Sequence, residues 1–214
     1  FVAVCGTPIP MLVGTDFDAV AAAVEARTGI PALGLATTGM HTYVSGAGMA
    51  LAAVARRFTD SAARCTNRRS VNVLGLTPLD FSVNGSDRSV RRLLEQAGWE
   101  IVSGWAMGSS LDALAGAGRA AVNLVVSSTG LPAAQVLRER FGTPWVAAAP
   151  FGRAFSETVL HALEAAADTG ICTVPYTQRE TAGADTVLIG ESVTTGSLAA
   201  AITAERGIRT RVLC

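Results

Sequence analysis

The sequence predicts an α/β fold made of tandem Rossmann-like units with parallel sheets. Within residues 71–152, short apolar runs alternate with helical patterns four times at nearly constant spacing. The apolar runs are continuous, as in strands that crossover helices bury on both faces. The predicted strands of this central unit are VNVLGL (71–76), EIVSGWAM (100–107), AVNLVVSS (121–128) and PWVAAAP (144–150).

Helical periodicity fills the stretches between and after these strands. The predicted helices of the central unit are SDRSVRRLLEQAG (86–98), SLDALAGAG (110–118), LPAAQVLRERFG (131–142) and FSETVLHALEAAADTG (155–170). Ligands of such open parallel sheets bind beyond the carboxyl ends of the strands. The loops that follow the strands are therefore the places to look for a site.

Two further blocks flank the central unit. Residues 1–69 are predicted to be an incomplete first α/β unit, residues 70–170 the central domain, and residues 171–214 the start of a further βαβ unit. In the first block we expect strands at 1–5 and 30–38 and helices over 16–27 and 45–58. Two linkers complete this division, Thr59–Ser70 and Gly170–Asp185. In the last block Gly207 stands where a helix C-cap belongs. The chain opens on Phe1 within a strand pattern, so we expect it to be a piece of a longer protein.

Composition narrows the function classes. Half of the residues are apolar and the formal net charge is zero, which argues against a nucleic-acid footprint. No apolar run reaches the roughly 18 residues that a membrane span needs, and no secretory start is present. We therefore expect a cytoplasmic protein that binds neither nucleic acid nor membrane.

The order of motifs resembles the component 1 family of nitrogenases and its relatives in cofactor assembly and chlorophyll biosynthesis. The motifs are Asn-x-Leu-Gly at 72–75, RLLEQAGWE at 92–100, A-x-N-L-V-V at 121–126, FGTP at 141–144 and PFG at 150–152. The segment from Pro10 to Met40 is similar to the strand, Gly-x-Asp loop and helix of that family. The resemblance implies an oxidoreductase subunit that takes electrons from an ATP-driven iron–sulfur reductase partner. It also implies assembly with a paralogous component 1-like subunit, as a homo- or hetero-oligomer.

At three positions the chain departs from that family's pattern. The cluster-ligating cysteine of the first loop matches Pro8, and the cysteine ligand after the Asn-Leu strand matches Ser127. The family's catalytic histidine matches Met49, after Gly48. Dinitrogen reduction at an iron–molybdenum cofactor is therefore not expected.

The four cysteines form no tight metal-binding spacing. Cys5 is a weak candidate for iron–sulfur ligation, and the alternative is that all four are buried or linker thiols. We expect no metal site and no cofactor in this piece of the protein. An iron–sulfur or metal cluster is expected only in a full-length complex.

Several loop side chains are candidates for ligand binding. His41 and Tyr43 follow the second strand of the first block, where a histidine can do acid–base work or simply lie on the surface. The loop Ser127, Ser128 and Thr129 can hold an anion or carboxylate with its N–H groups, or it can cap a helix. Ser109 lies in the loop Gly104–Ser110 and can equally be a cap. We expect these three loops to face a common cleft.

Two more loops are assigned mainly structural roles. Asp16 or Thr15 is the expected N-cap of the first long helix, with a functional role as the alternative. The loop Gly190–Ser197 is rich in hydroxyls, yet it lacks the phosphate-binding patterns of NAD or ATP sites.

Three functions remain open from the sequence. The first is a divergent reductase subunit that binds an organic ligand of the tetrapyrrole or corrinoid type. The second is a non-catalytic scaffold or cofactor-assembly subunit that pairs with a ligand-bearing paralogue. The third is a small-ligand sensor on the same fold.

Overall fold

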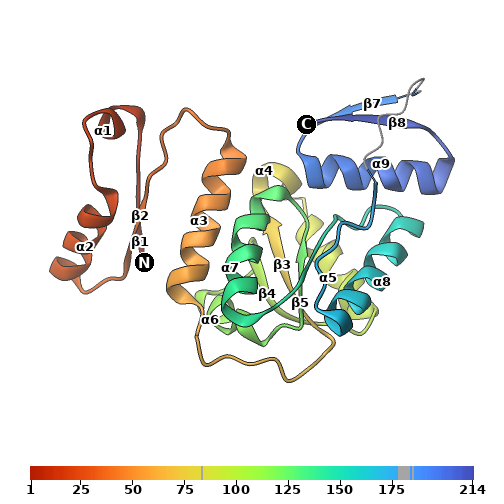
Figure 1. Cartoon of the computed structure of the whole chain (residues 1–214), viewed down its shortest axis with the longest axis horizontal. Helices are drawn as coiled ribbons and strands as arrows, with labels where there is room; N and C mark the ends of the chain where they lie inside the picture. The colour runs from red at the N-terminus through yellow and green to blue at the C-terminus, as the bar shows by residue number, and fades with distance from the viewer. Residues whose placement is uncertain (83, 178–183, 185) are drawn as a thin grey trace.

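Three parallel sheets follow one another along the chain (Figure 1). The computed structural model describes residues 1–82, 84–177, 184 and 186–214. All strand pairs in this part of the chain are parallel. The predicted α/β class with parallel sheets is therefore confirmed.

The first sheet pairs β1 (Val2–Cys5) with β2 (Ala32–Leu35). Between them run α1 (Pro8–Leu12) and α2 (Phe17–Thr28), and α3 (Tyr43–Phe58) follows β2. The sequence missed α1, a single turn whose first residue is a proline. Asp16 accepts a hydrogen bond from the backbone N–H of Ala19 at 2.9 Å, which is the N-cap that the sequence predicts.

The central sheet has the order β4-β3-β5-β6. Its strands are β3 (Ser70–Leu76), β4 (Glu100–Ala106), β5 (Val122–Val125) and β6 (Trp145–Ala147). Its helices are α4 (Pro78–Phe81), α5 (Ser86–Gln96), α6 (Leu111–Ala115), α7 (Leu131–Phe141) and α8 (Ala154–Thr169), with single 3₁₀ turns η1 (Gly116–Arg119) and η2 (Ser128–Gly130). The predicted strands and long helices are all present, and the short elements α4 and η2 are new.

Helices cover both faces of this sheet. On one face Val73, Val122 and Leu124 pack against Leu94 of α5 and Leu163 of α8. On the other face Leu74 and Val125 pack against Leu137 of α7 and Ala55 of α3. Burial on both faces explains why the strands read as unbroken apolar runs. The helix α3, which belongs to the first block, thus packs on the central unit, and the predicted division at residue 69 stays a prediction.

One row of polar side chains crosses the centre of the sheet on the α7 side. The Asn72 amide donates to Asn123 Oδ1 at 2.8 Å and to the carbonyl of Ala117 at 2.9 Å. Ser103 donates to Asn72 Oδ1 at 2.7 Å, and the Trp105 indole donates to Ser103 at 2.8 Å. All of these side chains are buried. A one-residue slip of any strand would break the row, so it fixes the register of three neighbouring strands.

The last block is the βαβ unit that the sequence predicts: β7 (Thr186–Ile189), α9 (Ser192–Arg206) and β8 (Thr210–Leu213). Gly207 ends α9 in the left-handed conformation at φ 66°. The first half of the second predicted linker makes one contact that the sequence did not indicate. Thr173 exchanges two backbone hydrogen bonds with β6, at 3.0 Å each to Trp145 and Ala147. The pairing is tertiary, and the local sequence, with a proline two residues on, gives no strand pattern. Most of the second half of this linker, residues 178–183 and 185, lies outside the described residues.

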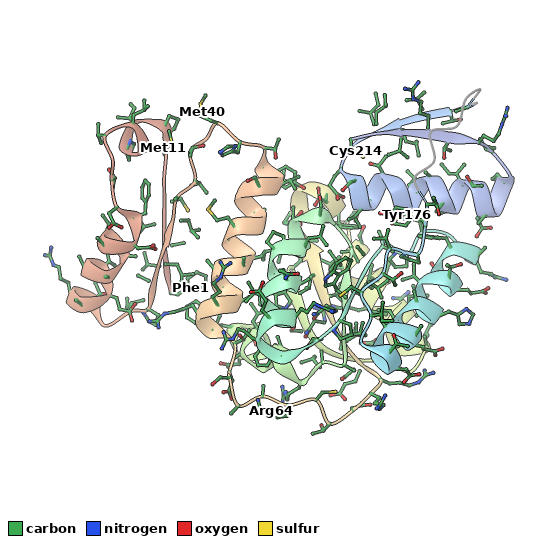
Figure 2. All side chains as sticks on the ribbon, viewed as in Figure 1. Phe1, Met11, Met40, Arg64, Tyr176 and Cys214 are labelled. Carbon is green, nitrogen blue, oxygen red and sulfur yellow. The ribbon has the colours of Figure 1, made fainter. Side chains whose placement is uncertain are left out.

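Figure 2 orients the two ends of the central sheet. Met40 lies at the end where the strands' carboxyl termini point, and Arg64 lies on the linker at the opposite end. Phe1 packs on Phe58 of α3 with ring centroids 5.2 Å apart. Among the described residues, no helix has both the length and the apolar character that crossing a bilayer requires.

Replacing Asp16 with Ala should lower the free energy of unfolding by about 1 kcal/mol, because the N-cap of α2 loses its acceptor. Urea unfolding of the variant measures this. Asp18→Ala is the control, since Asp18 lies in the first turn of α2 without the capping bond and should cost only a few tenths of a kcal/mol. Unchanged unfolding together with loss of ligand binding would show that Asp16 has a functional role instead.

Candidate functional site

The strand order reverses at the carboxyl ends of β3 and β5. The chain runs from β3 outward to β4, then returns across β3 to β5 and on to β6. The connections therefore leave these two adjacent strands in opposite directions. Ligands of open α/β sheets usually bind at such a point. The loop 77–80 follows β3, and the loop 126–130 follows β5.

Asp80, in the one-turn helix α4, is the centre of a hydrogen-bonded cluster at this reversal point. Its Oδ2 accepts hydrogen bonds from the Thr77 hydroxyl at 2.9 Å and from the Ser127 hydroxyl at 2.5 Å. Its Oδ1 accepts a short hydrogen bond from the Tyr43 hydroxyl. Thr77 also caps α4, and Pro78 starts it. The cluster thus joins β3, β5 and the beginning of α3.

Ser127 is fully buried, and its hydroxyl has hydrogen-bond partners both as donor and as acceptor. It donates to Asp80 and accepts from the Thr129 backbone N–H at 3.3 Å and from the Thr129 hydroxyl at 3.1 Å. Ser127 is also the N-cap of η2. Ser127 therefore acts as a cap, the alternative that the sequence left open for this loop. It also contacts Asp80, which the sequence did not indicate.

Two glycines allow the ends of β3 and the η2 loop to approach each other. A Cβ on Gly75 would lie 2.9 Å from the Ser127 carbonyl oxygen, and a Cβ on Gly130 would lie 2.8 Å from the Leu74 carbonyl carbon. Gly75 also has φ +86°, a conformation that other residues rarely adopt. The site therefore depends on backbone packing that only glycine permits.

Glu191, from the loop after β7, ties the last βαβ unit to the same loop. Its Oε1 accepts from the backbone N–H groups of Ser128 and Val193 at 2.7 Å each. Its Oε2 accepts from the backbone N–H and hydroxyl of Thr194, at 2.9 and 2.7 Å. Glu191 is thus both the N-cap of α9 and a bridge to η2.

The two carboxyl groups have opposite pKa shifts. Burial raises the pKa of Asp80, the hydrogen bond from Ser127 opposes this, and the nearby charge of Glu191 adds to the rise. Burial also acts to raise the pKa of Glu191, but hydrogen bonds from Ser128, Thr194 and Val193 outweigh it and lower the pKa. Asp80 is the group of this pair that retains a proton more readily, and Glu191 is the group held ionised.

The candidate residues of the sequence fall into two sets. Tyr43, Ser127 and Thr129 belong to the Asp80 cluster, and Ser128 belongs to the Glu191 bridge. His41 is exposed on the loop that leads to Tyr43. Ser109 makes a hydrogen bond within its own loop, where its hydroxyl accepts from the Gly104 N–H at 3.2 Å. Their roles stay predictions.

Sequence reasoning missed Asp80 and Glu191. The signal for Asp80 was present as Thr77-Pro78-Leu79-Asp80, a capped one-turn helix directly after a strand. Glu191 offered a helix-start signal, yet its bond to Ser128 joins residues 63 positions apart. Only the tertiary structure shows that contact.

The donor set of this cluster does not suit an iron–sulfur cluster. It offers one carboxylate and several hydroxyls, which are hard ligands, whereas iron–sulfur clusters are held by thiolates. Cys5, exposed at the end of β1, lies in another sheet. Pro8 begins α1, and Met49 lines a separate cavity of about 770 Å³ between α2, β2 and α3. No group of three or more His, Cys, Asp or Glu that could hold a metal occurs among residues 1–82, 84–177, 184 and 186–214.

The comparison with protein families decides the membership of the chain. The model of the nitrogenase component 1 type oxidoreductases matches residues 1–208. The chain belongs to this family. The resemblance noted from the motifs is therefore confirmed.

Individual relatives match shorter parts. A light-independent protochlorophyllide reductase subunit of Prosthecochloris aestuarii is 41% identical over 90 residues, which is 41% of this chain and 16% of that protein. The subunit of the same name from Leptolyngbya boryana is 35% identical over 88 residues, which is 41% of this chain and 17% of that protein. Matches to these curated relatives thus span less than a fifth of their length.

Solved nitrogenase structures share the fold. Nitrogenase Cp1 at pH 5 superposes with a TM-score of 0.66 at 18% identity, over 99% of this chain and 45% of that one. Nitrogenase Cp1 at pH 6.5 gives a TM-score of 0.64 at 19% identity, over 99% and 43%. The chain therefore spans less than half the length of these nitrogenase chains.

Shortening Glu191 to Asp should separate its two roles. Aspartate is a good N-cap for α9, but it is one methylene too short to reach Ser128 as well. We expect Glu191→Asp to lower the free energy of unfolding by about 1.5 kcal/mol, as for a lost hydrogen bond to a charged group. Glu191→Ala should cost clearly more, and Glu157→Asp, at an exposed position of α8, should cost little. Equal unfolding curves for Glu191→Asp and the unchanged protein would contradict the bridge.

The raised pKa of Asp80 also predicts a pH dependence of stability. The folded state binds the Asp80 proton more tightly than the unfolded state, so this contribution is present at low pH and is lost as pH rises through the raised pKa. An Asp80→Asn variant should therefore gain stability relative to the unchanged protein as the pH rises above about 3.9, the ordinary aspartate pKa. Urea unfolding at several pH values measures the difference. A difference that is constant, or that moves the other way, would show that the carboxylate is stabilised in the folded state.

Proposed function

We propose that the full-length protein is a nitrogenase-like reductase subunit that acts on an organic substrate of the tetrapyrrole type. The substrate would lie over the carboxyl ends of β3 and β5, near Asp80, Ser127 and Tyr43. Electrons would come from an ATP-dependent iron–sulfur reductase partner. A paralogous component 1-like subunit would complete the complex.

The observation that carries this proposal is the Asp80 cluster at the point where the strand order reverses. Reducing a carbon–carbon or carbon–nitrogen double bond consumes a proton for each electron. Burial raises the pKa of the Asp80 carboxyl, which favours the protonated form that a general acid needs. Tyr43 and Ser127 fix the orientation of both carboxyl oxygens. Asp80 is only half-buried, so a ligand that binds over the loops after β3 and β5 can reach it.

Family membership supports the reductase assignment. The curated relatives are named as protochlorophyllide reductase subunits, and protochlorophyllide is a tetrapyrrole. The hydroxyl and carboxylate side chains of the cluster suit a polar organic ligand better than a metal–sulfur cofactor. An iron–sulfur cluster that delivers the electrons would have to be held by other parts of the complex.

A second candidate function is a non-catalytic scaffold or cofactor-assembly subunit. Pro8, Met49 and Ser127 stand where the family resemblance places two cluster or cofactor ligands and a histidine. A subunit that had given up these groups could still pair with a ligand-bearing paralogue. This function predicts no dependence of catalysis on Asp80.

The test is reduction of protochlorophyllide by the full-length protein assembled with its paralogue and an ATP-dependent iron–sulfur reductase. Asp80→Asn should lower the rate by about 100-fold, the usual contribution of a positioned proton donor. Asp112→Asn, an exposed carboxyl of α6, is the matched control and should leave the rate unchanged.

Two results would contradict the proposal. A rate for Asp80→Asn equal to that of the unchanged protein would remove Asp80 as the proton donor. A stable complex with the paralogue that reduces no tetrapyrrole would favour the scaffold function.

A further inference from the structure

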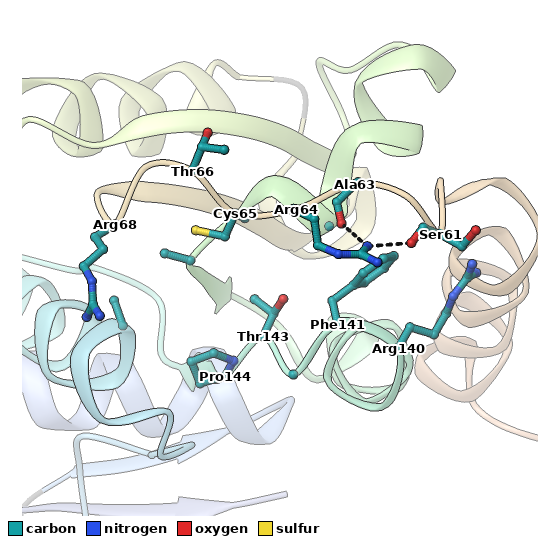
Figure 3. Close-up of a pocket in the computed structure, with 15 residues that line it drawn as sticks. Ser61, Ala63, Arg64, Cys65, Thr66, Arg68, Arg140, Phe141, Thr143 and Pro144 are labelled. Atoms are coloured by element: carbon teal, nitrogen blue, oxygen red, sulfur yellow. Dashed lines mark hydrogen bonds between the residues drawn. The ribbon is translucent and has the colours of Figure 1, made fainter.

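A cavity lies at the end of the central sheet opposite the Asp80 cluster (Figure 3). Its volume is about 700 Å³. One wall is the irregular linker that joins α3 to β3. The other wall consists of residues that precede β5 and β6, such as Ala121 and Pro144. The cavity is therefore at the amino ends of the strands, whereas Asp80 and Ser127 lie at the carboxyl ends.

Three arginines line this cavity, and no aspartate or glutamate does. They are Arg64 and Arg68 of the linker and Arg140 near the end of α7. Arg68 lies 3.2 Å from Asp168 in an exposed ion pair. Within the described part of the chain, Arg64 and Arg140 form no ion pair. The cavity thus carries positive charge that no lining carboxylate balances.

The guanidinium group of Arg64 is held in place by uncharged partners. Its Nη1 donates to the carbonyls of Ser61 and Ala63 at 2.7 and 2.8 Å, contacts that Figure 3 shows beside Phe141. The linker itself is fixed here, because the Asp60 N–H donates to the Ala115 carbonyl at 2.9 Å. The Nε and Nη2 donors of Arg64 are not used by these bonds.

Arg140 is fixed in a similar way on the opposite side. Its Nη1 donates to the carbonyls of Ala55 and Arg56 at 3.0 and 2.7 Å, and its Nη2 donates to the carbonyl of Thr59 at 3.1 Å. These bonds cap the carboxyl end of α3 and leave the charge of Arg140 unneutralised. The two guanidinium groups are pre-oriented, so less side-chain entropy is lost when a ligand binds.

We propose that this cavity binds a small multivalent oxyanion, such as a phosphorylated or polycarboxylate metabolite. Arginine forks match the oxygen geometry of phosphate and carboxylate groups. Cys65 and Thr143, which also line this space, add polar side chains to it. Three arginines, one of them paired outside the cavity with Asp168, thus converge on a space that no carboxylate lines.

Cys65 is a reporter inside the cavity. Its thiol is exposed and contacts only the nearby Asn67 carbonyl, at 3.4 Å, among the hydrogen bonds of the described residues. In the full-length protein, we would measure the alkylation rate of each cysteine with iodoacetamide, an uncharged reagent, by peptide mass spectrometry. Pyrophosphate and citrate are the two probes, and sodium chloride at equal ionic strength is the salt control.

We expect at least one probe to slow alkylation of Cys65 by several-fold and to leave Cys5, at the end of β1, unaffected. Equilibrium dialysis with labelled pyrophosphate or citrate should give one site per chain. Protection by pyrophosphate alone would assign a phosphorylated ligand, protection by citrate alone a polycarboxylate, and protection by both a site that selects charge.

Arg64→Gln should weaken binding by about tenfold or more, as for one lost charge-assisted contact. Arg68→Gln is the second variant and should weaken it in the same direction. Arg88→Gln, at an exposed position of α5 on another surface, is the matched control and should bind normally. Equal protection by sodium chloride, unchanged binding by both Arg64→Gln and Arg68→Gln, or no saturable binding below about 1 mM would each overturn the proposal.

Discussion

The reversal of strand order between β3 and β5 is the constraint on which the candidate site depends. It separates the loops after these two strands while keeping the strands themselves hydrogen-bonded neighbours. Gly75 and Gly130 then let the η2 backbone come within contact of β3. As a result, Ser127 reaches Asp80 directly, at 2.5 Å. A side chain at either glycine would push the two loops apart and break the cluster.

The site also shows that the three sequence blocks do not act separately. The first block contributes Tyr43 at the beginning of α3, and the last block contributes Glu191 at the beginning of α9. Both side chains bind residues of the central unit. Apolar packing supports the same arrangement, since Ala52 of α3 and Val193 of α9 share a core with Leu74. The position of the flanking units therefore sets the geometry of the central loops.

The regular part of this fold could be predicted because its signals are local. Continuous apolar strands, helical periodicity and the Asp16 cap each depend on residues close in sequence. The pairing of Thr173 with β6 could not, because it is a tertiary contact without a strand pattern. For the site, the rule that ligands bind at strand carboxyl ends pointed to the loops of Tyr43 and Ser127. It could not indicate Asp80 as their common partner, since α4 is too short to give a periodic signal.

The contacts of Ser127 bear on whether this position is a metal site that has decayed. A decayed ligand position would leave a buried polar group without partners, which is costly in the interior. Ser127 instead donates one hydrogen bond and accepts two. A thiol there would be a much weaker donor to the Asp80 carboxylate. Serine at 127 and aspartate at 80 therefore fit one another as hydrogen-bond donor and acceptor.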